Sequence, residues 1–283
     1  MKTLLALVLI LAQAPPEADV VRDVEFGKGG DRALKMHLVK PKAPSKDPMP
    51  VMVYIYGGGW KAGSRDAGIR PLSRLAAKGY FGASIEYRLS QEARFPAQIE
   101  DCKCAIRFLR SKAKEYGIDP ERIGVWGPSA GGHLAALVGT SGDIKELEGT
   151  GGSAEFSSRV QAVADWFGPT DFLKMGQNKI DHDAANSPES QLIGGAIQEN
   201  KEKVAKANPI SYVTKDDPPF LIMHGDKDEL VPLSQSEMLH EALQKAGVES
   251  TLKVMAGQGH GFRGGDAEAP VELFFDKALR PRK

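Results

Sequence analysis

A turn between a short apolar run and an apolar helical segment is the feature that most limits the fold of this chain. Residues 122–126 form the run, Gly127-Pro128-Ser129-Ala130-Gly131 follows at once, and helical spacing continues to residue 138. The two glycines leave room for a tight strand-to-helix turn, which strains the serine backbone and pushes the hydroxyl outward. The start of the helix also favours developing negative charge. We therefore expect an α/β fold in which Ser129 is a nucleophile on such a turn.

Strand and helix signals alternate along the rest of the chain, which predicts a mostly parallel central sheet flanked by helices. The predicted strands are 20–26, 34–39, 51–56, 81–87, 122–126, 160–167, 220–224 and 250–255, of which the first two form a hairpin. The predicted helices are 71–78, 96–116, 129–138, 188–194, 199–207, 234–246 and 269–279. Residues 140–158 are rich in Gly, Ser and charge and are predicted to form a surface excursion.

The length and charge of the chain indicate one large domain and argue against a nucleic-acid partner. The chain has 283 residues, 41% of them hydrophobic, which suits one large domain over residues 15–283. The polar stretch 174–212 is the place where such a fold would carry a small cap-like insertion over its site. Lys plus Arg and Asp plus Glu both number 37, so we expect no nucleic-acid partner. The sequence gives no indication of the oligomeric state.

The first fourteen residues have the pattern of a signal peptide. Lys2 is followed by an apolar run to Ala12, and the small residues Ala12 and Ala14 flank the expected cleavage region. The run is too short for a permanent membrane anchor. We therefore expect a secreted or periplasmic protein with no stable membrane anchor.

The two cysteines, Cys102 and Cys104, lie two residues apart in a predicted helix. Their side chains therefore diverge and do not pair easily. No nearby His or Cys supplies further metal ligands. We expect buried free thiols, no metal site and no cofactor.

A serine nucleophile needs a base and an acid, and in this chain order the acid precedes the histidine. His260 lies in a glycine-rich loop after the last predicted strand, where it can reach over the serine. Asp228 lies at the tip of the loop after strand 220–224 and is the preferred acid. Asp171 is the runner-up acid, and Asp226 is better interpreted as shaping its turn through its own backbone.

The other histidines downstream of the serine have local interpretations. His133 lies one turn into the helix and is expected to pack or to form a hydrogen bond. His224 ends a strand and is expected to fix the following turn. His182 lies in the polar insertion, and His240 is expected on a helix surface.

A glycine-rich loop, Tyr56-Gly57-Gly58-Gly59-Trp60, follows the predicted strand 51–56. Its glycines let the backbone approach a substrate closely. The N–H groups of Gly58 and Gly59, with that of Ala130, are the expected oxyanion donors. A phosphate cradle is disfavoured because no Gly-Lys-Ser/Thr follows.

These motifs together resemble the esterase/lipase branch of the α/β-hydrolases, and most closely its secreted bifunctional acetylxylan/feruloyl esterases. The matching pieces are Gly57–Trp60, Glu86–Leu89, Ser129–Ala135, Phe167–Asp171, His224-Gly225 with Asp228, and Gly259–Phe262. The resemblance implies Ser129, Asp228 and His260 as a catalytic triad, and the same three oxyanion donors. Two residues depart from relatives: Tyr56 replaces a common His, and Pro128 replaces the Asp usual in the hormone-sensitive-lipase branch.

The segment before the first core strand is too short for the two-helix cap of the hormone-sensitive-lipase branch, so we expect an open site. Trp60, Trp166, Phe167 and Pro169 are predicted to contact the substrate, because sugar and phenolic rings stack on aromatic side chains. The expected activity is hydrolysis of short-chain acyl or feruloyl esters, as small molecules or carried by plant polysaccharides. The alternatives are an arylformamidase-like amide hydrolase and a generic short-chain lipase or esterase. A non-catalytic binding protein is disfavoured because all three triad residues are present.

Overall fold

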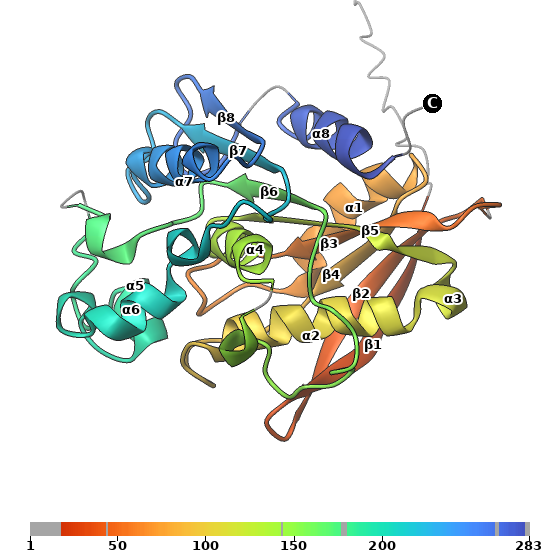
Figure 1. Cartoon of the computed structure of the whole chain (residues 1–283), viewed down its shortest axis with the longest axis horizontal. Helices are drawn as coiled ribbons and strands as arrows, with labels where there is room; N and C mark the ends of the chain where they lie inside the picture. Colours follow the sequence, from red (N-terminus) through yellow and green to blue (C-terminus); the bar gives the residue numbers. More distant parts are fainter. Residues whose placement is uncertain (1–17, 44, 143, 177–179, 264–265, 281–283) are drawn as a thin grey trace, which may run out of the picture.

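An eight-stranded sheet crosses the molecule, with α1 and α8 on one face and α2 and α4 on the other (Figure 1). The computed structural model describes residues 18–43, 45–142, 144–176, 180–263 and 266–280. The predicted leader, residues 1–14, lies outside the described residues. The strand order is β1-β2-β4-β3-β5-β6-β7-β8; β2 pairs antiparallel with β1 and β4, and all other neighbours are parallel. The predicted fold class, an α/β-hydrolase fold with a mostly parallel sheet, is confirmed.

The elements have the following bounds. The strands are β1 Ala18–Gly29, β2 Arg32–Pro41, β3 Met49–Ile55, β4 Phe81–Ile85, β5 Ile118–Pro128, β6 Ala162–Trp166, β7 Phe220–Gly225 and β8 Ser250–Met255. The helices are α1 Ile69–Ala76, α2 Ala97–Ser111, α3 Ala113–Tyr116, α4 Ala130–Thr140, α5 Pro188–Ile193, α6 Lys201–Ala207, α7 Ser234–Lys245 and α8 Ala269–Leu279. Five short 3-10 helices, η1 to η5, lie in the described connections.

The core follows from the position of each strand in the sheet. Every residue of β4 and β7 is buried, because helices cover both faces of these inner strands. Edge strand β8 instead alternates between half-buried and exposed residues over most of its length. The continuous apolar runs in the sequence therefore mark inner strands of the sheet.

The prediction of a single helix over residues 96–116 is wrong, because the structure has two helices there. α2 and α3 are separated by Lys112, whose N–H is shared between the carbonyl groups of Phe108 and Leu109. Gly117 then ends α3 in the left-handed region at φ +63°. The apolar spacing continues across the break, so periodicity alone does not reveal it.

The segment 140–158 is more than a surface excursion. Glu148 in this segment forms ion pairs with the buried side chains of Lys103 and Arg107 in α2, with N–O distances of 2.8 and 2.7 Å. The carbonyl oxygen of Gly151 accepts a hydrogen bond from the N–H of Lys28 in β1. The segment therefore compensates two charges that α2 buries.

The two thiols behave as predicted. Cys102 and Cys104 are both buried and free. Burial raises the pKa of each thiol, which keeps them protonated and unreactive near neutral pH.

The polar insertion 174–212 forms α5, η4 (Ile197–Glu199), α6 and η5 (Pro209–Tyr212) at one end of the sheet (Figure 1). It has an apolar underside, with Leu192 and Val204 completely buried. The N–H of Phe95 donates to the carbonyl oxygen of Leu192 at 3.0 Å, which ties α5 to the loop before α2.

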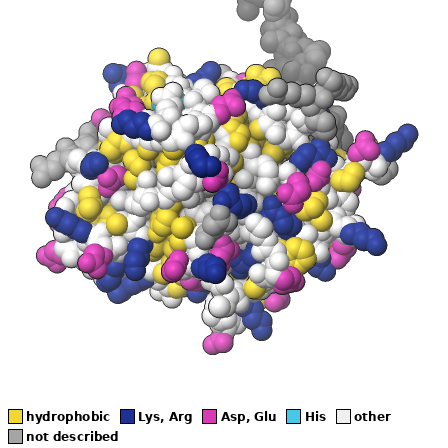
Figure 2. Space-filling model, in the orientation of Figure 1, with side chains coloured by type: hydrophobic (Ala, Val, Ile, Leu, Met, Phe, Trp, Pro, Cys, Tyr) yellow, Lys and Arg dark blue, Asp and Glu magenta, His cyan; other side chains and the backbone are white. Residues whose placement is uncertain are grey.

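Lysine, arginine and acidic side chains are interspersed on the surface in view (Figure 2). This distribution agrees with the equal numbers of basic and acidic residues in the chain. Within the described ranges, no helix is long and apolar enough to cross a membrane.

Candidate active site

Ser129 lies on the turn between β5 and α4, as the sequence predicts. Its backbone has φ 55° and ψ −123°, a conformation that non-glycine residues rarely adopt. The Ser129 N–H donates to the carbonyl oxygen of Trp166 in β6 at 2.8 Å, and its own carbonyl oxygen accepts from His133 N–H at 2.9 Å. The strained residue is therefore held from both sides by neighbouring elements.

The glycines around the serine are required by close approach of backbone. A Cβ atom on Gly131 would lie 2.1 Å from the carbonyl oxygen of Ile55. A Cβ atom on Gly127 would lie 2.5 Å from the same oxygen and from the Gly131 backbone. The turn thus fits against the end of β3 only without side chains at these two positions.

The structure brings Ser129, His260 and Asp228 together in one hydrogen-bonded line. The Ser129 Oγ atom lies 2.8 Å from Nε2 of His260, and His260 Nδ1 lies 2.7 Å from Oδ2 of Asp228. The carboxylate accepts, so Nδ1 carries the proton and Nε2 is free to accept from the serine hydroxyl. The Asp228 side chain is completely buried, whereas 17% of the His260 side chain is exposed.

Backbone contacts hold the loops of the acid and the base to each other. The N–H of Lys227 donates to the carbonyl oxygen of Gln258 at 2.9 Å. The Asp226 carboxylate accepts from the N–H of Gly257 at 2.6 Å. Asp226 therefore joins the two loops, a contact outside the turn of its own that the sequence led us to expect it to shape. A Cβ atom on Gly225 would lie 2.2 Å from the Gln258 oxygen, so this position also requires glycine.

The Asp228 carboxylate is surrounded by donors. Its Oδ1 accepts from the N–H groups of Leu230 and Val231, each at 2.9 Å, and its Oδ2 lies 3.3 Å from Nε2 of His224. Burial alone would raise the pKa of Asp228, but the hydrogen bonds from His224, His260 and Val231 outweigh it and hold that pKa well below its ordinary value. Asp228 is therefore ionised at neutral pH.

The contact between His224 and Asp228 was not expected from the sequence. His224 does hold the following turn, as expected, because its Nε2 also lies 2.9 Å from the carbonyl oxygen of Val231. The signal for its second partner is the spacing of four residues between the histidine at a strand end and the acid in the loop.

The runner-up acid, Asp171, has a different role. Its carboxylate accepts from the N–H of Leu173 and from the side-chain amide of Asn208, and so caps the short helix η3 (Phe172–Lys174). Asp171 is not hydrogen-bonded to His260, whose acidic partner is Asp228.

Unpaired backbone donors lie beside Ser129. Gly58 and Gly59 have φ +116° and +60°, values that glycine adopts without strain. In the part of the chain that the structure describes, the N–H groups of Gly58, Gly59 and Ala130 have no hydrogen-bond partner. All three residues line the same cavity as Ser129. This is the arrangement that an oxyanion hole requires.

Trp60 anchors the glycine loop to the protein interior. Its indole N–H donates to Nδ1 of His133 at 3.2 Å, and His133 Nε2 donates to the carbonyl oxygen of Ala207 in α6 at 2.8 Å. Both rings also pack against Phe172. Burial lowers the pKa of His133 to about 4, so the ring is neutral and bridges the loop to the cap-like insertion. His133 has the hydrogen-bonding role expected for it.

The cavity that contains Ser129 and His260 has a volume of about 360 Å³. Of the predicted substrate contacts, Trp60, Phe167 and Pro169 line it. Trp60 is only 2% exposed, so it presents little surface to the cavity. Trp166 requires a correction, because it is not among the lining residues. Its ring packs edge-on against Trp126 and Phe262, with ring centroids 4.9 and 5.0 Å apart.

The insertion contributes a wall of this cavity through Ile180, His182, Pro188 and Glu189. His182 was expected in the insertion, but neither His182 nor Glu189 was expected at the site. Polar residues in a polar segment give no sequence signal of burial. Among the described residues, no cluster of His, Cys, Asp or Glu has the composition of a metal site.

Comparison with known proteins identifies the family. A model of the BD-FAE family matches residues 36–243. Esterase LipC of Mycobacterium tuberculosis is 32% identical over 265 residues, which cover 90% of this chain and 64% of LipC. A bifunctional GH43-CE structure from Bacteroides eggerthii has 37% identity and a TM-score of 0.84, and the match covers 92% of this chain but 38% of that chain.

A truncated carbohydrate esterase from gut microbiota has 34% identity and a TM-score of 0.84, with coverage of 94% of this chain and 98% of that chain. This chain thus spans less than two thirds of LipC and of the GH43-CE protein. The two solved structures agree with the overall fold described above, and the family match covers most of the chain. The chain belongs to the BD-FAE family of α/β-hydrolase esterases.

Proposed function

We propose that the protein is a serine carboxylesterase that hydrolyses short-chain acyl or feruloyl esters. The observation that carries this proposal is the line from Ser129 Oγ through His260 to the buried Asp228 carboxylate. A Ser–His–Asp line of this geometry, beside unpaired N–H groups, performs acyl transfer in unrelated folds.

The proposed reaction has two halves. His260 Nε2 takes the hydroxyl proton while Ser129 Oγ attacks the ester carbonyl carbon, and Asp228 stabilises the imidazolium that forms. The N–H groups of Gly58, Gly59 and Ala130 stabilise the oxyanion of the tetrahedral intermediate. His260 then gives its proton to the leaving alcohol. In the second half, water attacks the acyl-Ser129 ester and His260 again serves as base and then as acid.

The substrate proposal is an ester carried by a plant polysaccharide. It is supported by the similarity to the GH43-CE and carbohydrate esterase structures and by a cavity that Phe167 and Pro169 line beside the nucleophile. We also propose that the protein acts outside the cytoplasm, on the basis of the signal-peptide pattern in residues 1–14. N-terminal sequencing of exported protein tests that location.

The decisive experiment for the activity is Ser129→Ala assayed with p-nitrophenyl acetate. We expect the variant to fold and to lose measurable turnover, because Ala has no nucleophile. Full activity in a folded Ser129→Ala protein would exclude the proposal. Rates on acetylated xylan, methyl ferulate and p-nitrophenyl esters of rising chain length then define the acyl and alcohol preference.

A further inference from the structure

We propose that His182 and Glu189 form a polar subsite in the catalytic cavity that binds a hydroxyl group of the substrate. The inference rests on the proposed esterase function and specifies what the cavity recognises. It concerns two ionisable side chains that neither the proposed reaction nor the family assignment uses.

The pair is buried and incompletely satisfied. Each side chain is 5% exposed, and Nδ1 of His182 lies 3.1 Å from Oε2 of Glu189. Despite this distance, the two atoms are not aligned for a hydrogen bond. Within the described ranges, His182 Nδ1, His182 Nε2 and Glu189 Oε2 have no hydrogen-bond partner. Buried polar atoms without partners cost free energy, so such atoms at a cavity wall mark a place for a ligand.

Backbone and helix-capping contacts hold the pair in place. The carbonyl oxygen of His182 accepts from the Ser187 hydroxyl at 2.6 Å, and Ser187 caps α5 by accepting from the N–H of Ser190 at 3.0 Å. These contacts leave the His182 ring and the Glu189 carboxylate available to a ligand.

The same helix start places the pair beside the reacting centre. A Cβ atom on Gly59 would lie 3.2 Å from Cβ of Pro188, so the start of α5 is packed against the glycine-rich loop 56–60. His182 and Glu189 line the same 360 Å³ cavity as Ser129 and His260. A group bound by the pair is therefore part of a molecule whose ester can reach Ser129.

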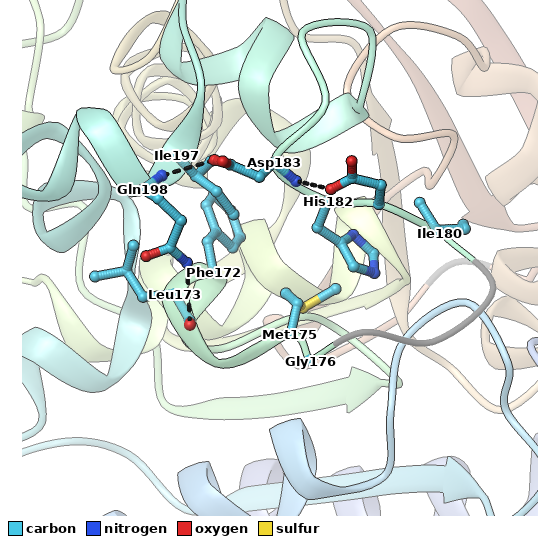
Figure 3. A pocket seen from close by; sticks show the side chains of 10 residues that line it. Phe172, Leu173, Met175, Gly176, Ile180, His182, Asp183, Ile197 and Gln198 are labelled. Carbon is cyan, nitrogen blue, oxygen red and sulfur yellow. Dashed lines mark hydrogen bonds between the residues drawn. The ribbon is translucent and has the colours of Figure 1, made fainter.

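His182 also faces a second, larger pocket of about 720 Å³, shown in Figure 3. The side chain of the next residue, Asp183, points away and accepts from the N–H of Gln198 at 2.8 Å (Figure 3). Ile180 and His182 line both spaces, so the two spaces adjoin at these residues. A substrate that extends beyond the catalytic cavity would pass His182.

A hydroxyl group matches this pair better than other substrate groups. It can donate to the Glu189 carboxylate and accept from a His182 N–H at the same time. A carboxylate on the substrate would be repelled by Glu189, and an alkyl chain would leave the polar atoms unpaired. The other walls beside the nucleophile, such as Phe167, Pro169 and Val231, offer apolar side chains. The hydroxyl can belong to the acyl group, as in a phenolic acid, or to the alcohol, as in a sugar.

The test compares pairs of esters that differ in hydroxyl groups. The first pair, methyl 4-hydroxycinnamate and methyl cinnamate, tests a hydroxyl group on the acyl side of the ester. The second pair, a monoacetylated methyl xyloside and cyclohexyl acetate, tests hydroxyl groups on the alcohol side. The readout is the ratio of kcat/KM within each pair, for wild type, His182→Phe, Glu189→Gln and Glu202→Gln. Glu202 is the matched control, because it is an exposed acid in α6 of the same insertion that lines neither of the two pockets.

We expect the wild type to prefer the hydroxylated ester in one of the two pairs. His182→Phe should lower that ratio by about tenfold or more, because a site built for a hydroxyl rejects its absence through unpaired polar groups. Glu189→Gln, which keeps the shape and an acceptor oxygen, should lower it less, and Glu202→Gln should leave it unchanged. The pair of esters whose kcat/KM ratio falls shows whether the bound hydroxyl group belongs to the acyl group or to the alcohol.

Unchanged ratios in both His182→Phe and Glu189→Gln would overturn the subsite while the esterase function stands, whatever happens to the absolute rates. A second readout is independent of turnover: binding of methyl 4-hydroxycinnamate and of the acetylated xyloside to Ser129→Ala protein by calorimetry. If the wild type hydrolyses none of these esters, the proposed function fails. In that case, the binding measurement is made on Ser129→Ala and on the double variant Ser129→Ala/His182→Phe. Equal affinity of the two proteins for these esters also rejects the subsite, and weaker binding by the double variant supports it.

Discussion

His224 Nε2 lies 3.3 Å from the Asp228 Oδ2 atom that also accepts the hydrogen bond from His260. The same Nε2 lies 2.9 Å from the carbonyl oxygen of Val231, and His224 Nδ1 lies 2.7 Å from the Ser236 hydroxyl. Both neighbours of Nε2 are acceptors, so this nitrogen carries the proton and Nδ1 accepts from Ser236. A second, fully buried imidazole thus orients the carboxylate that orients His260.

Replacing His224 is predicted to slow catalysis without weakening substrate binding. In His224→Leu the Asp228 carboxylate loses one donor, and the carbonyl oxygen of Val231 loses its side-chain partner. Hydrogen bonds to charged groups contribute about 1.5–3 kcal/mol, so we expect kcat to fall by about tenfold or more while KM stays similar. Kinetics with p-nitrophenyl acetate measure both constants. His224→Gln, which keeps an N–H donor, should restore part of kcat, and a wild-type kcat in His224→Leu would contradict this role.

The acid is predicted to be Asp228 and not Asp171. In Asp228→Asn the amide can donate to His260, which favours the wrong tautomer for accepting the serine proton. The corresponding change in another serine hydrolase lowers kcat by roughly 10⁴-fold, and we expect a loss of that order here. Asp171→Asn is the matched control, since the amide oxygen can still cap η3, and its kcat should be that of the wild type. Equal losses in the two variants would contradict the assignment.

The turn at Ser129 is predicted not to tolerate a methyl group at Gly131. The Cβ atom of Gly131→Ala would lie 2.1 Å from the Ile55 oxygen, and backbone cannot yield as a flexible side chain does. We expect little folded protein and no esterase activity. Gly247→Ala is the comparison: Gly247 has φ +83°, but a Cβ atom there would meet no atom within 4 Å. That variant should lose about 1–2 kcal/mol of stability through backbone strain alone and keep its specific activity. Thermal unfolding and kcat distinguish the two cases.

The grouping of Ser129, Asp228 and His260 could be predicted because each residue belongs to a local pattern with a fixed chain order. Parallel strands bring their carboxyl ends to one edge of the sheet, so loops after β5, β7 and β8 meet there. The inner strands were visible as apolar runs for the same reason, since helices cover them on both faces.

Side-chain contacts between distant segments could not be predicted in this way. Trp166 ends β6 and is followed by Phe167, whose backbone has φ 44°, yet of the two only Phe167 lines the cavity. His182 and Glu189 lie in a segment whose composition resembles a solvated loop. Their burial depends on how α5 packs against the glycine loop, which neither periodicity nor propensity encodes.

Two buried ionisable side chains, His133 and Asp165, are predicted to have opposite effects on the pH dependence of stability. Burial lowers the pKa of His133 to about 4, so its contribution is present above about pH 6.5 and is lost as the pH falls towards 4. Burial raises the pKa of Asp165 to about 6, so stability is lost as the pH rises from about 4 to 6. The Asp165 carboxylate lies close to the backbone of His133, since a Cβ atom on Gly168 would lie within 2.6 Å of both the His133 backbone nitrogen and Oδ1 of Asp165.

Each shift corresponds to about 3 kcal/mol, so in the wild type the two slopes largely cancel between pH 4 and 6. His133→Gln can keep the contacts to Trp60 and Ala207 but does not titrate, so its stability relative to wild type should fall as the pH rises from 4 to 7. Asp165→Asn can still accept from the N–H of Gly168, and its relative stability should rise over the same interval. Urea unfolding of the three proteins at pH 4, 5.5 and 7 measures both differences. Differences that do not change with pH, or that change in the same direction for both variants, would contradict the assigned protonation states.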